Sequence, residues 1–145
     1  LWLLTGEGQM FADARTRGPQ IPFYDVDVEH GLKHLEHLEP ESNLILSPVG
    51  ACDLAMCYTG RAMGALVPPG TVVLLKAVDR DAIIPGGEYA IVSRKIVTLR
   101  IVRAADEEDK VRLVAGDREN YDDILLNVSD IVAVYKVKGK LIINS

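Results

Sequence analysis

The feature that most constrains this fold is a series of short apolar runs separated by turn residues. Runs such as TVVLL and YAIV are of strand length, and they alternate with turns such as VPPG, PGG and ADEED. Short apolar runs bounded by such turns are typical of β-strands, and no long segment has helical periodicity. The sequence therefore predicts a mostly β fold, either an open barrel or a sandwich, with at most one or two short helices.

The same pattern places the expected elements along the chain. Residues 29–43 predict a short helix whose start is weakened by Gly31 and whose end is set by Pro40. A KGK turn is expected to separate the last two strands. The expected strands cover residues 21–28, 44–47, 52–59, 71–77, 88–93, 95–103, 110–115, 130–137 and 140–143.

The size and charge of the chain exclude some classes of protein. It has 145 residues, a net charge of −5 and an apolar content of 48%. That size fits one domain with a core of its own. The acidic balance argues against nucleic-acid binding by this part of the chain, because phosphate binding needs a clustered basic surface. The apolar runs are too short to cross a membrane, so no membrane partner is expected.

The two cysteines, Cys52 and Cys57, lie five residues apart in an expected strand. An odd separation places their side chains on opposite faces of a strand, too far apart for a disulfide bond. Cys57 has no nearby cation to lower the pKa of its thiol, which favours a core position over a nucleophile. Free thiols are typical of a reducing compartment, so we expect a cytoplasmic protein.

All three histidines, His30, His34 and His37, lie in the expected helix. At 100° per residue they fall within about 60° of one another, so one helix face could carry them. Imidazoles on successive turns can bind zinc. The alternative is a solvated polar face opposite the leucines of the same segment, and the spacing alone does not select the metal site.

One expected strand, residues 95–103, places an arginine among apolar neighbours. Alternation divides it into a face with Val97, Leu99 and Ile101 and a face with Ile96, Thr98, Arg100 and Val102. A half-buried arginine needs an acceptor or a path to water, so we expect Arg100 to be ion-paired or to reach solvent. The functional alternative is that this position once held a different residue with a chemical role.

The stretch CDLAMCYTGRAMGALVPPGTVVLLK resembles the loop and strands around the nucleophile in the LexA and phage-repressor peptidase family. Ala62 stands where that family has its catalytic serine. Two aspartates of the family's following turn are replaced here, by Pro69 and Thr71. The residues that match the family pattern are Asp53, Gly60, Met63 and Gly70.

Two further stretches extend the resemblance over residues 21–143. GGEYAIVSRKIVTLRIVR is similar to the family segment that carries the general-base lysine, and Arg100 stands at the position of that lysine. In the same stretch Thr98 matches the family, and Leu99 stands for a valine. IPFYDVDVEHG looks like the family's self-cleavage segment, in which His30 and Gly31 would flank the cut.

The resemblance implies the C-terminal domain of that family over residues 21–145, a homodimer built from several short, curled antiparallel sheets. It also implies that the chemistry is lost. Ala62 supplies no nucleophile, and the guanidinium of Arg100 stays protonated and cannot act as a base. The implied protein is a pseudo-peptidase that uses no cofactor.

Residues 1–11, with the stretch WLLTGEGQM, resemble the end of the helix-turn-helix domain of repressor-type regulators. Such a domain would precede Leu1 and would bind operator DNA, since its recognition helix enters the major groove. Residues 12–20 carry small, charged and helix-breaking residues, which indicates a linker. We therefore expect a truncated transcriptional regulator whose subunits are paired by residues 21–145.

Two alternatives remain open at the level of sequence. The chain could be an active self-cleaving repressor of the same family, which a cut near His30–Gly31 would identify. It could also be a ligand- or metal-sensing module that uses the three histidines, and stabilisation by zinc would identify the metal version.

Overall fold

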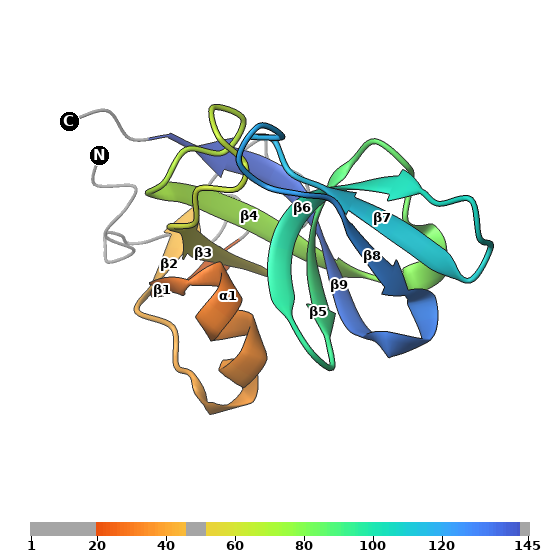
Figure 1. Ribbon diagram of the computed structural model, residues 1–145. Coiled ribbons are helices and arrows are strands. Elements are labelled where there is room, and N and C mark those ends of the chain that lie inside the picture. Colours follow the sequence, from red (N-terminus) through yellow and green to blue (C-terminus); the bar gives the residue numbers. More distant parts are fainter. Residues whose placement is uncertain (1–19, 46–51, 143–145) are drawn as a thin grey trace.

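The computed structural model describes residues 20–45 and 52–142 (Figure 1). The fold is mostly β, as predicted, and its nine strands form one sheet in the order β2-β1-β3-β4-β9-β5-β6-β7-β8, which is not closed into a barrel. The strands are β1 (Gln20–Asp27), β2 (Ser42–Ile45), β3 (Leu54–Tyr58), β4 (Thr71–Val78), β5 (Glu88–Ser93), β6 (Val97–Ala104), β7 (Lys110–Val114), β8 (Ile124–Asn127) and β9 (Ile131–Leu141). The helical elements of the described residues are the α-helix α1 (Val28–Gly31) and the 3-10 turns η3 (Leu32–His37), η4 (Arg80–Ala82) and η5 (Val128–Asp130).

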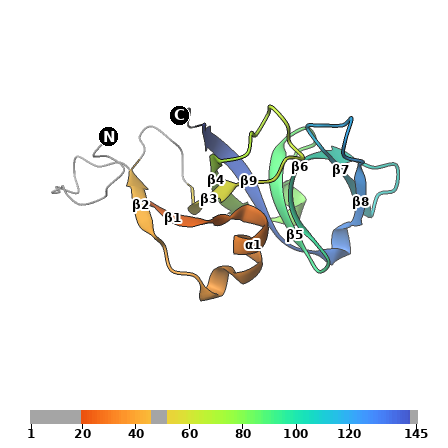
Figure 2. The ribbon, with the colours of Figure 1, turned by 60° about the vertical axis from the view of Figure 1, so that its left-hand side comes forward.

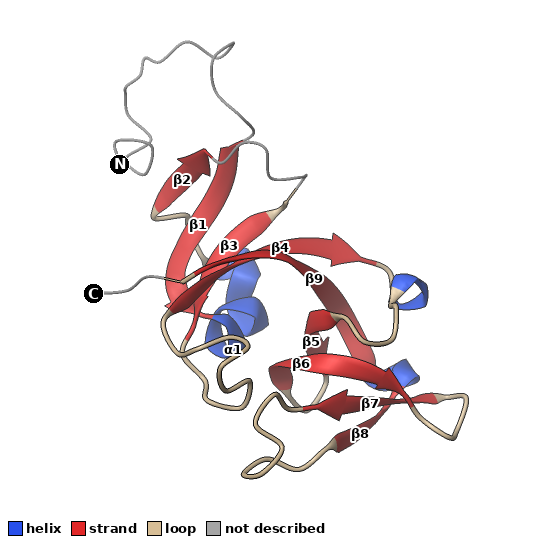
Figure 3. Cartoon of the chain, turned by 90° about the horizontal axis from the view of Figure 1, so that it is seen from above, coloured by secondary structure: helices blue, strands red, loops and turns tan. Residues whose placement is uncertain are grey.

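Strand β9 joins two groups of strands into this sheet. Its residues 134–141 pair with β4, and its residues 131–136 pair with β5. The group β2-β1-β3-β4 therefore lies on one side of β9 and the group β5-β6-β7-β8 on the other (Figures 2 and 3). The sheet is thus continuous rather than divided into separate sheets. It is also mixed, because β1 and β3 are parallel.

The turn expected at KGK does not form, and the two last strands of the prediction are one strand. The register of β4 and β9 shifts so that Gly139 faces Leu74 and Val137 faces Leu75, which leaves Lys138 as an extra residue. Such a β-bulge bends a strand without ending it. Glycine suits the site because a Cβ at Gly139 would lie only 3.0 Å from Leu74 Cδ1.

Other strand predictions vary in accuracy. Those for 71–77, 88–93 and 110–115 are confirmed within a residue of their bounds. β3 and β6 begin two residues later than expected, and β2 begins two residues earlier. β8 was not predicted, because it is only four residues long and only Leu126 among them is buried. The predicted residues 46–47 and 143 lie outside the described part of the chain, as do residues 1–19, the expected helix-turn-helix end and nearly all of the expected linker.

Residues 29–43 do not form one helix. The α-helix ends at Gly31, the 3-10 turn that follows is kinked at His34 (φ −124°, ψ 26°), and the chain is already extended at Leu38, before Pro40. Gly31 is the last residue of α1 rather than part of its start, and the close packing around it favours glycine. A Cβ at Gly31 would lie 2.5 Å from Val26 Cγ2 and 2.8 Å from Met56 Cε.

The predicted alternation of β6 is confirmed by its packing. Leu99 is fully buried in a core cluster with Val28, Tyr58 and Met63, and Val97 and Ile101 pack against the same cluster. Val102, from the opposite face, lies in a second cluster with Tyr89, Ile91 and Leu113. β6 therefore separates two cores, and Arg100 shares the face of the second.

Asp27 fastens the end of β1 to two other segments. One carboxylate oxygen accepts from the Glu29 backbone N–H at 3.0 Å, which caps α1. The other accepts from the Thr59 backbone N–H at 2.8 Å and from the Thr59 hydroxyl at 2.6 Å. One side chain therefore sets both the start of the helix and the start of the turn after β3.

Replacing Asp27 by alanine is expected to lower the free energy of unfolding by about 1 to 3 kcal/mol, because the cap and both Thr59 bonds are lost. Urea denaturation followed by circular dichroism measures the change. Asp25→Ala is the matched control on the same strand, since its carboxylate has only a long contact of 3.9 Å with the Cys57 thiol. Equal losses in the two variants would contradict the role given to Asp27.

Candidate functional site

The turn between β3 and β4 carries Ala62 at its centre, and its backbone is tightly folded. Ala62 is 7% exposed and Met63 is fully buried. The Gly64 N–H donates to the Arg61 carbonyl at 3.1 Å, and the Gly70 N–H donates to the Tyr58 carbonyl at 2.7 Å. The turn is thus closed at its base and rigid at its centre.

Glycines in this turn are required for two different reasons. Gly64 and Gly70 have φ of +57° and +94°, in the left-handed region that favours glycine. At Gly60 the reason is steric, since a Cβ there would lie 2.8 Å from the Tyr58 hydroxyl. The residues expected to frame the turn therefore have structural roles. Gly60 and Gly70 permit the path of the backbone, and Met63 is buried in the core.

Residues 115–123, which we call the strap, link β7 to β8 and lie against the Ala62 turn. The Asp117 N–H donates to the Ala62 carbonyl at 2.9 Å. A Cβ at Gly116 would lie 2.1 Å from the Met63 carbonyl oxygen, so only glycine permits this approach. The turn and the strap are therefore in direct backbone contact.

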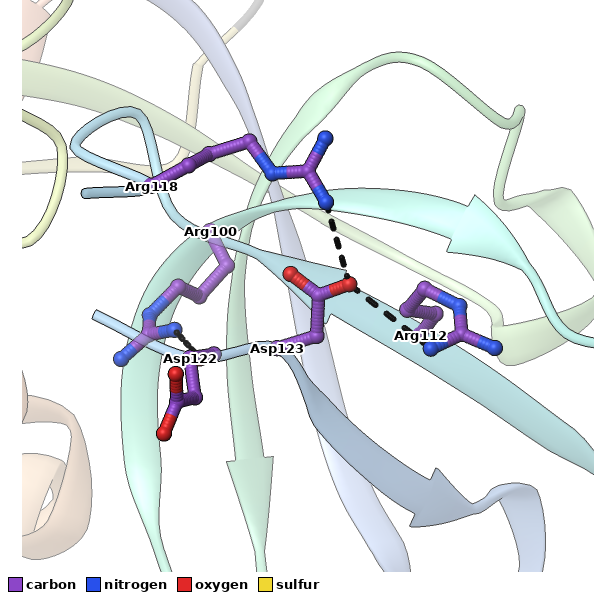
Figure 4. Close-up of polar contacts among 5 residues, drawn as sticks. All are labelled: Arg100, Arg112, Arg118, Asp122 and Asp123. Carbon is purple, nitrogen blue, oxygen red and sulfur yellow. Dashed lines mark hydrogen bonds and ion pairs between the residues drawn. The ribbon is translucent and has the colours of Figure 1, made fainter. Parts of the chain in front are cut away.

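Arg100 holds the other end of the strap (Figure 4). Its side chain is buried, with the residue 8% exposed, and its Nη1 donates to the Asp122 carbonyl at 3.2 Å. The guanidinium carbon lies 6.0 Å from the centre of the Tyr121 ring. The expected acceptor is thus the Asp122 carbonyl, and within the described residues Arg100 makes no ion pair.

The strap has its own polar contacts. Asp123 Oδ2 lies 3.7 Å from Arg112 Nη1 and 3.4 Å from Arg118 Nη2 (Figure 4). The Asp117 carboxylate accepts from the Asn120 side-chain amide at 3.0 Å, which closes a turn inside the strap. These contacts fix the strap between Arg100 and the Ala62 turn.

Two buried polar atoms near this site, Tyr58 Oη and Arg100 Nε, have no hydrogen-bond partner among the residues that the structure describes. The Met63 backbone lies near the Tyr58 hydroxyl but makes no hydrogen bond of good geometry with it. Burial raises the pKa of Tyr58, the negative charge of Glu29 raises it further, and the Arg100 cation opposes both. Tyr58, Glu29 and Arg100 therefore lie within electrostatic reach of one another.

Helix α1 completes the site, because it packs against β6. Burial raises the pKa of Glu29, the carboxylate of Asp27 raises it further, and Arg100 lowers it. Gly31 is buried against Met56, whereas His30 is exposed. Helix α1 and the Ala62 turn thus contribute Val28 and Met63 to one core cluster with Leu99. Arg100, on the other face of β6, lies within electrostatic reach of Glu29 and Tyr58.

The His30–Gly31 peptide bond lies inside a helical turn. Chains are cut most readily at exposed and irregular segments, where the backbone can leave its hydrogen bonds. Gly31 is the last residue of α1 and its neighbours leave no space even for a methyl group. In this conformation the bond is protected from proteolysis.

The three histidines are not arranged as a metal site. The rings of His30 and His34 lie 5.2 Å apart, and the kink at His34 breaks the helix face on which the spacing argument depends. In residues 20–45 and 52–142 no group of three or more His, Cys, Asp or Glu side chains could hold a metal ion. We therefore propose no metal site at His30, His34 and His37.

Cys57 is a free thiol that is half-buried, whereas the sequence favoured a core position for it. Burial raises its pKa first, and the nearby carboxylate of Asp25 raises it further. A raised pKa keeps the thiol protonated, so it is a poor nucleophile.

Among the described elements, no helix is long and apolar enough to span a membrane.

Sequence reasoning missed three parts of this site: Asp27, Glu29 and the strap. The Asp-x-Glu spacing at the start of α1 is a helix-cap signal that could have identified the first two. Nothing in the sequence near Gly116 indicated that it would meet Met63, which is 53 positions away. Contacts between distant turns are set by the whole fold.

No family model and no curated protein matches this chain.

Replacing Tyr58 by phenylalanine is expected to leave the free energy of unfolding unchanged or to raise it by up to about 1 kcal/mol, because the lost hydroxyl has no partner. Tyr89→Phe is the matched control. Tyr89 is equally buried, but its hydroxyl accepts from the Ile84 N–H at 3.0 Å, so its loss should cost about 1 to 2 kcal/mol. A larger loss in Tyr58→Phe than in Tyr89→Phe, measured by urea denaturation, would mean that the Tyr58 hydroxyl has a stabilising partner.

Proposed function

We propose that this chain is the C-terminal self-association and effector domain of a helix-turn-helix transcriptional regulator, with a peptidase-like fold that has lost self-cleavage. The observation that carries the proposal is the contact of the Ala62 turn and Arg100 with one strap, together with the electrostatic reach of Arg100 to Glu29, which precedes the His30–Gly31 bond. The Ala62 turn, Arg100 and the His30–Gly31 turn correspond to the nucleophile, the base and the cleavage segment of the LexA and phage-repressor peptidases that the sequence resembles.

The side chains at the three places support an inactive protein. Ala62 has no atom that can attack a carbonyl. The guanidinium of Arg100 has only N–H donors and cannot act as a general base, and it is engaged with the Asp122 carbonyl. The His30–Gly31 bond is helical and partly buried. Each of these changes alone would stop a serine–lysine dyad, and all three are present.

The frame around the lost chemistry is retained, which favours a role that depends on the fold rather than on catalysis. In a regulator that role is self-association. A paired domain places two recognition helices about one DNA turn apart, as a palindromic operator requires. Operator binding would belong to a domain before Leu1, in agreement with the net charge of −5 on this chain.

The proposal predicts that the chain forms a dimer in solution. Light scattering during size-exclusion chromatography is expected to give twice the 15.9 kDa of one chain, with a proportion of dimer that rises with protein concentration. The thermal midpoint should rise with concentration as well, because dimerisation is linked to folding. A chain that stays monomeric at high concentration would contradict self-association as its function.

The proposal also predicts that the chain does not cut itself. Prolonged incubation at alkaline pH should leave it intact, and Ala62→Ser should stay intact too, since Arg100 still cannot accept a proton. Only Ala62→Ser combined with Arg100→Lys restores both groups, because burial can keep a lysine neutral. That double variant is expected to react with a serine-directed fluorophosphonate, and Ala62→Ser alone is not.

Mass spectrometry of the incubated samples gives the decisive readout. A fragment that ends at His30 from the unaltered chain would show an active peptidase and overturn the inactive assignment. Labelling of the double variant at a serine other than residue 62 would show that Ala62 and Arg100 do not occupy a former dyad.

A further inference from the structure

A surface pocket of about 340 Å³ lies between the α1–η3 segment and the turn that joins β5 to β6. Glu29 and Lys33 line one side of it, and residues 92–97 line the other. Its volume falls within the range of small-molecule sites. None of the three segments singled out from the sequence explains this pocket, although Glu29 borders both it and the Arg100 site.

The charge of the pocket is opposite to that of the protein. Three cations line it, Lys33, Arg94 and Lys95, against the single carboxylate of Glu29, while the whole chain has a net charge of −5. All three cations are exposed, and in the described part of the chain none of them makes an ion pair. Unpaired cations gathered around a concave surface attract an anion.

Two further carboxylates lie near the pocket without lining it, and each is held by hydrogen bonds. Asp27 accepts hydrogen bonds from Thr59 and from the Glu29 backbone, and Asp130 accepts from the side chain of Asn127 at 3.5 Å. The residues that line the pocket itself carry three positive charges and one negative charge.

The turn that carries two of the cations is held in place by its own hydrogen bonds. The Ser93 hydroxyl oxygen accepts from the backbone N–H groups of Lys95 and Ile96, at 3.2 and 3.0 Å, and the hydroxyl donates to the Ile96 carbonyl at 2.9 Å. The Arg94 N–H donates to the Asp130 carbonyl at 3.1 Å. The backbone of the turn thus needs no ordering when a ligand binds, which favours affinity.

The remaining lining is apolar. Val92 and Val97 are half-buried and pack against the core cluster of Leu99, and Ile96 is half-buried beside them. Cations beside such a surface fit a ligand with an anionic group and a short apolar body. A bare inorganic anion would leave the apolar part unused.

We propose that this pocket binds a small organic carboxylate, which bridges the α1–η3 segment and the β5–β6 turn. The anionic group lies among Lys33, Arg94 and Lys95, and the apolar body lies on Val92 and Val97. The proposal rests on the proposed function, since a regulator's effector domain is where a signalling ligand acts. It names the chemical class of that signal and the place where it binds.

Benzoate is a suitable probe, and benzamide is its uncharged counterpart of nearly the same shape. Titration of the isotope-labelled chain at constant ionic strength, followed by amide resonances, is expected to show saturable benzoate binding with shifts confined to residues near 29–33 and 92–97. Benzamide should bind at least about tenfold more weakly, because it lacks the charge that the cations attract. Higher salt should weaken benzoate binding.

Matched double variants test the named cations. Arg94→Gln with Lys95→Gln is expected to raise the benzoate dissociation constant about tenfold. Arg61→Gln with Lys138→Gln removes the same charge from exposed sites outside the pocket and should leave it nearly unchanged. Glu29→Gln should tighten binding, because it removes the one carboxylate of the lining.

The proposal is overturned if benzoate does not bind, if benzamide binds equally well, or if both double variants weaken binding to the same extent. None of these results concerns the oligomeric state. Failure of the pocket proposal can therefore be told apart from failure of the proposed function. A chain that stays monomeric but binds benzoate in the pocket would contradict self-association and support the binding site.

Discussion

The contact on which the described structure most depends is the one between the Ala62 turn and the strap. The turn belongs to the strands on one side of β9, and the strap belongs to the strands on the other side. An open sheet joined only through β9 could flex at that strand, but the packing of α1 on β6 and the Asp117–Ala62 hydrogen bond also join the two groups. Gly116 makes this possible by its size rather than by its backbone angles, since any side chain there would strike the Met63 carbonyl.

Arg100 explains how the strap stays in position at that contact. A buried cation is costly unless it has partners, and the planar guanidinium can donate to a carbonyl while it faces an aromatic ring. Arg100 does both, at Asp122 and Tyr121. A lysine has a single ammonium group and could not reproduce this arrangement. On the proposed function, the base has been replaced by a residue whose role is to hold the strap.

Features set by a strand's own sequence could be predicted, and features set by distant contacts could not. The alternation of β6 and the bounds of β4 and β5 follow from local apolar patterns, so they are confirmed. The continuity of β9 through KGK depends on its pairing with β4, and a local turn signal gives no account of a partner strand. In the same way, the burial of Arg100 was predicted from its neighbours, but its partners lie 21 and 22 positions away in the strap.

The conformation of residues 28–31 connects the lost chemistry with the pocket. A segment that is cut in an active site has to leave its helix and extend beside the nucleophile. Here the Asp27 cap and the packing of Gly31 hold the same residues in a helical turn, and Glu29 on that turn borders the pocket. A helical α1 cannot serve as a substrate, but it can form one wall of a binding site. On the proposed function, the packing that holds α1 helical would both prevent cleavage and create the pocket.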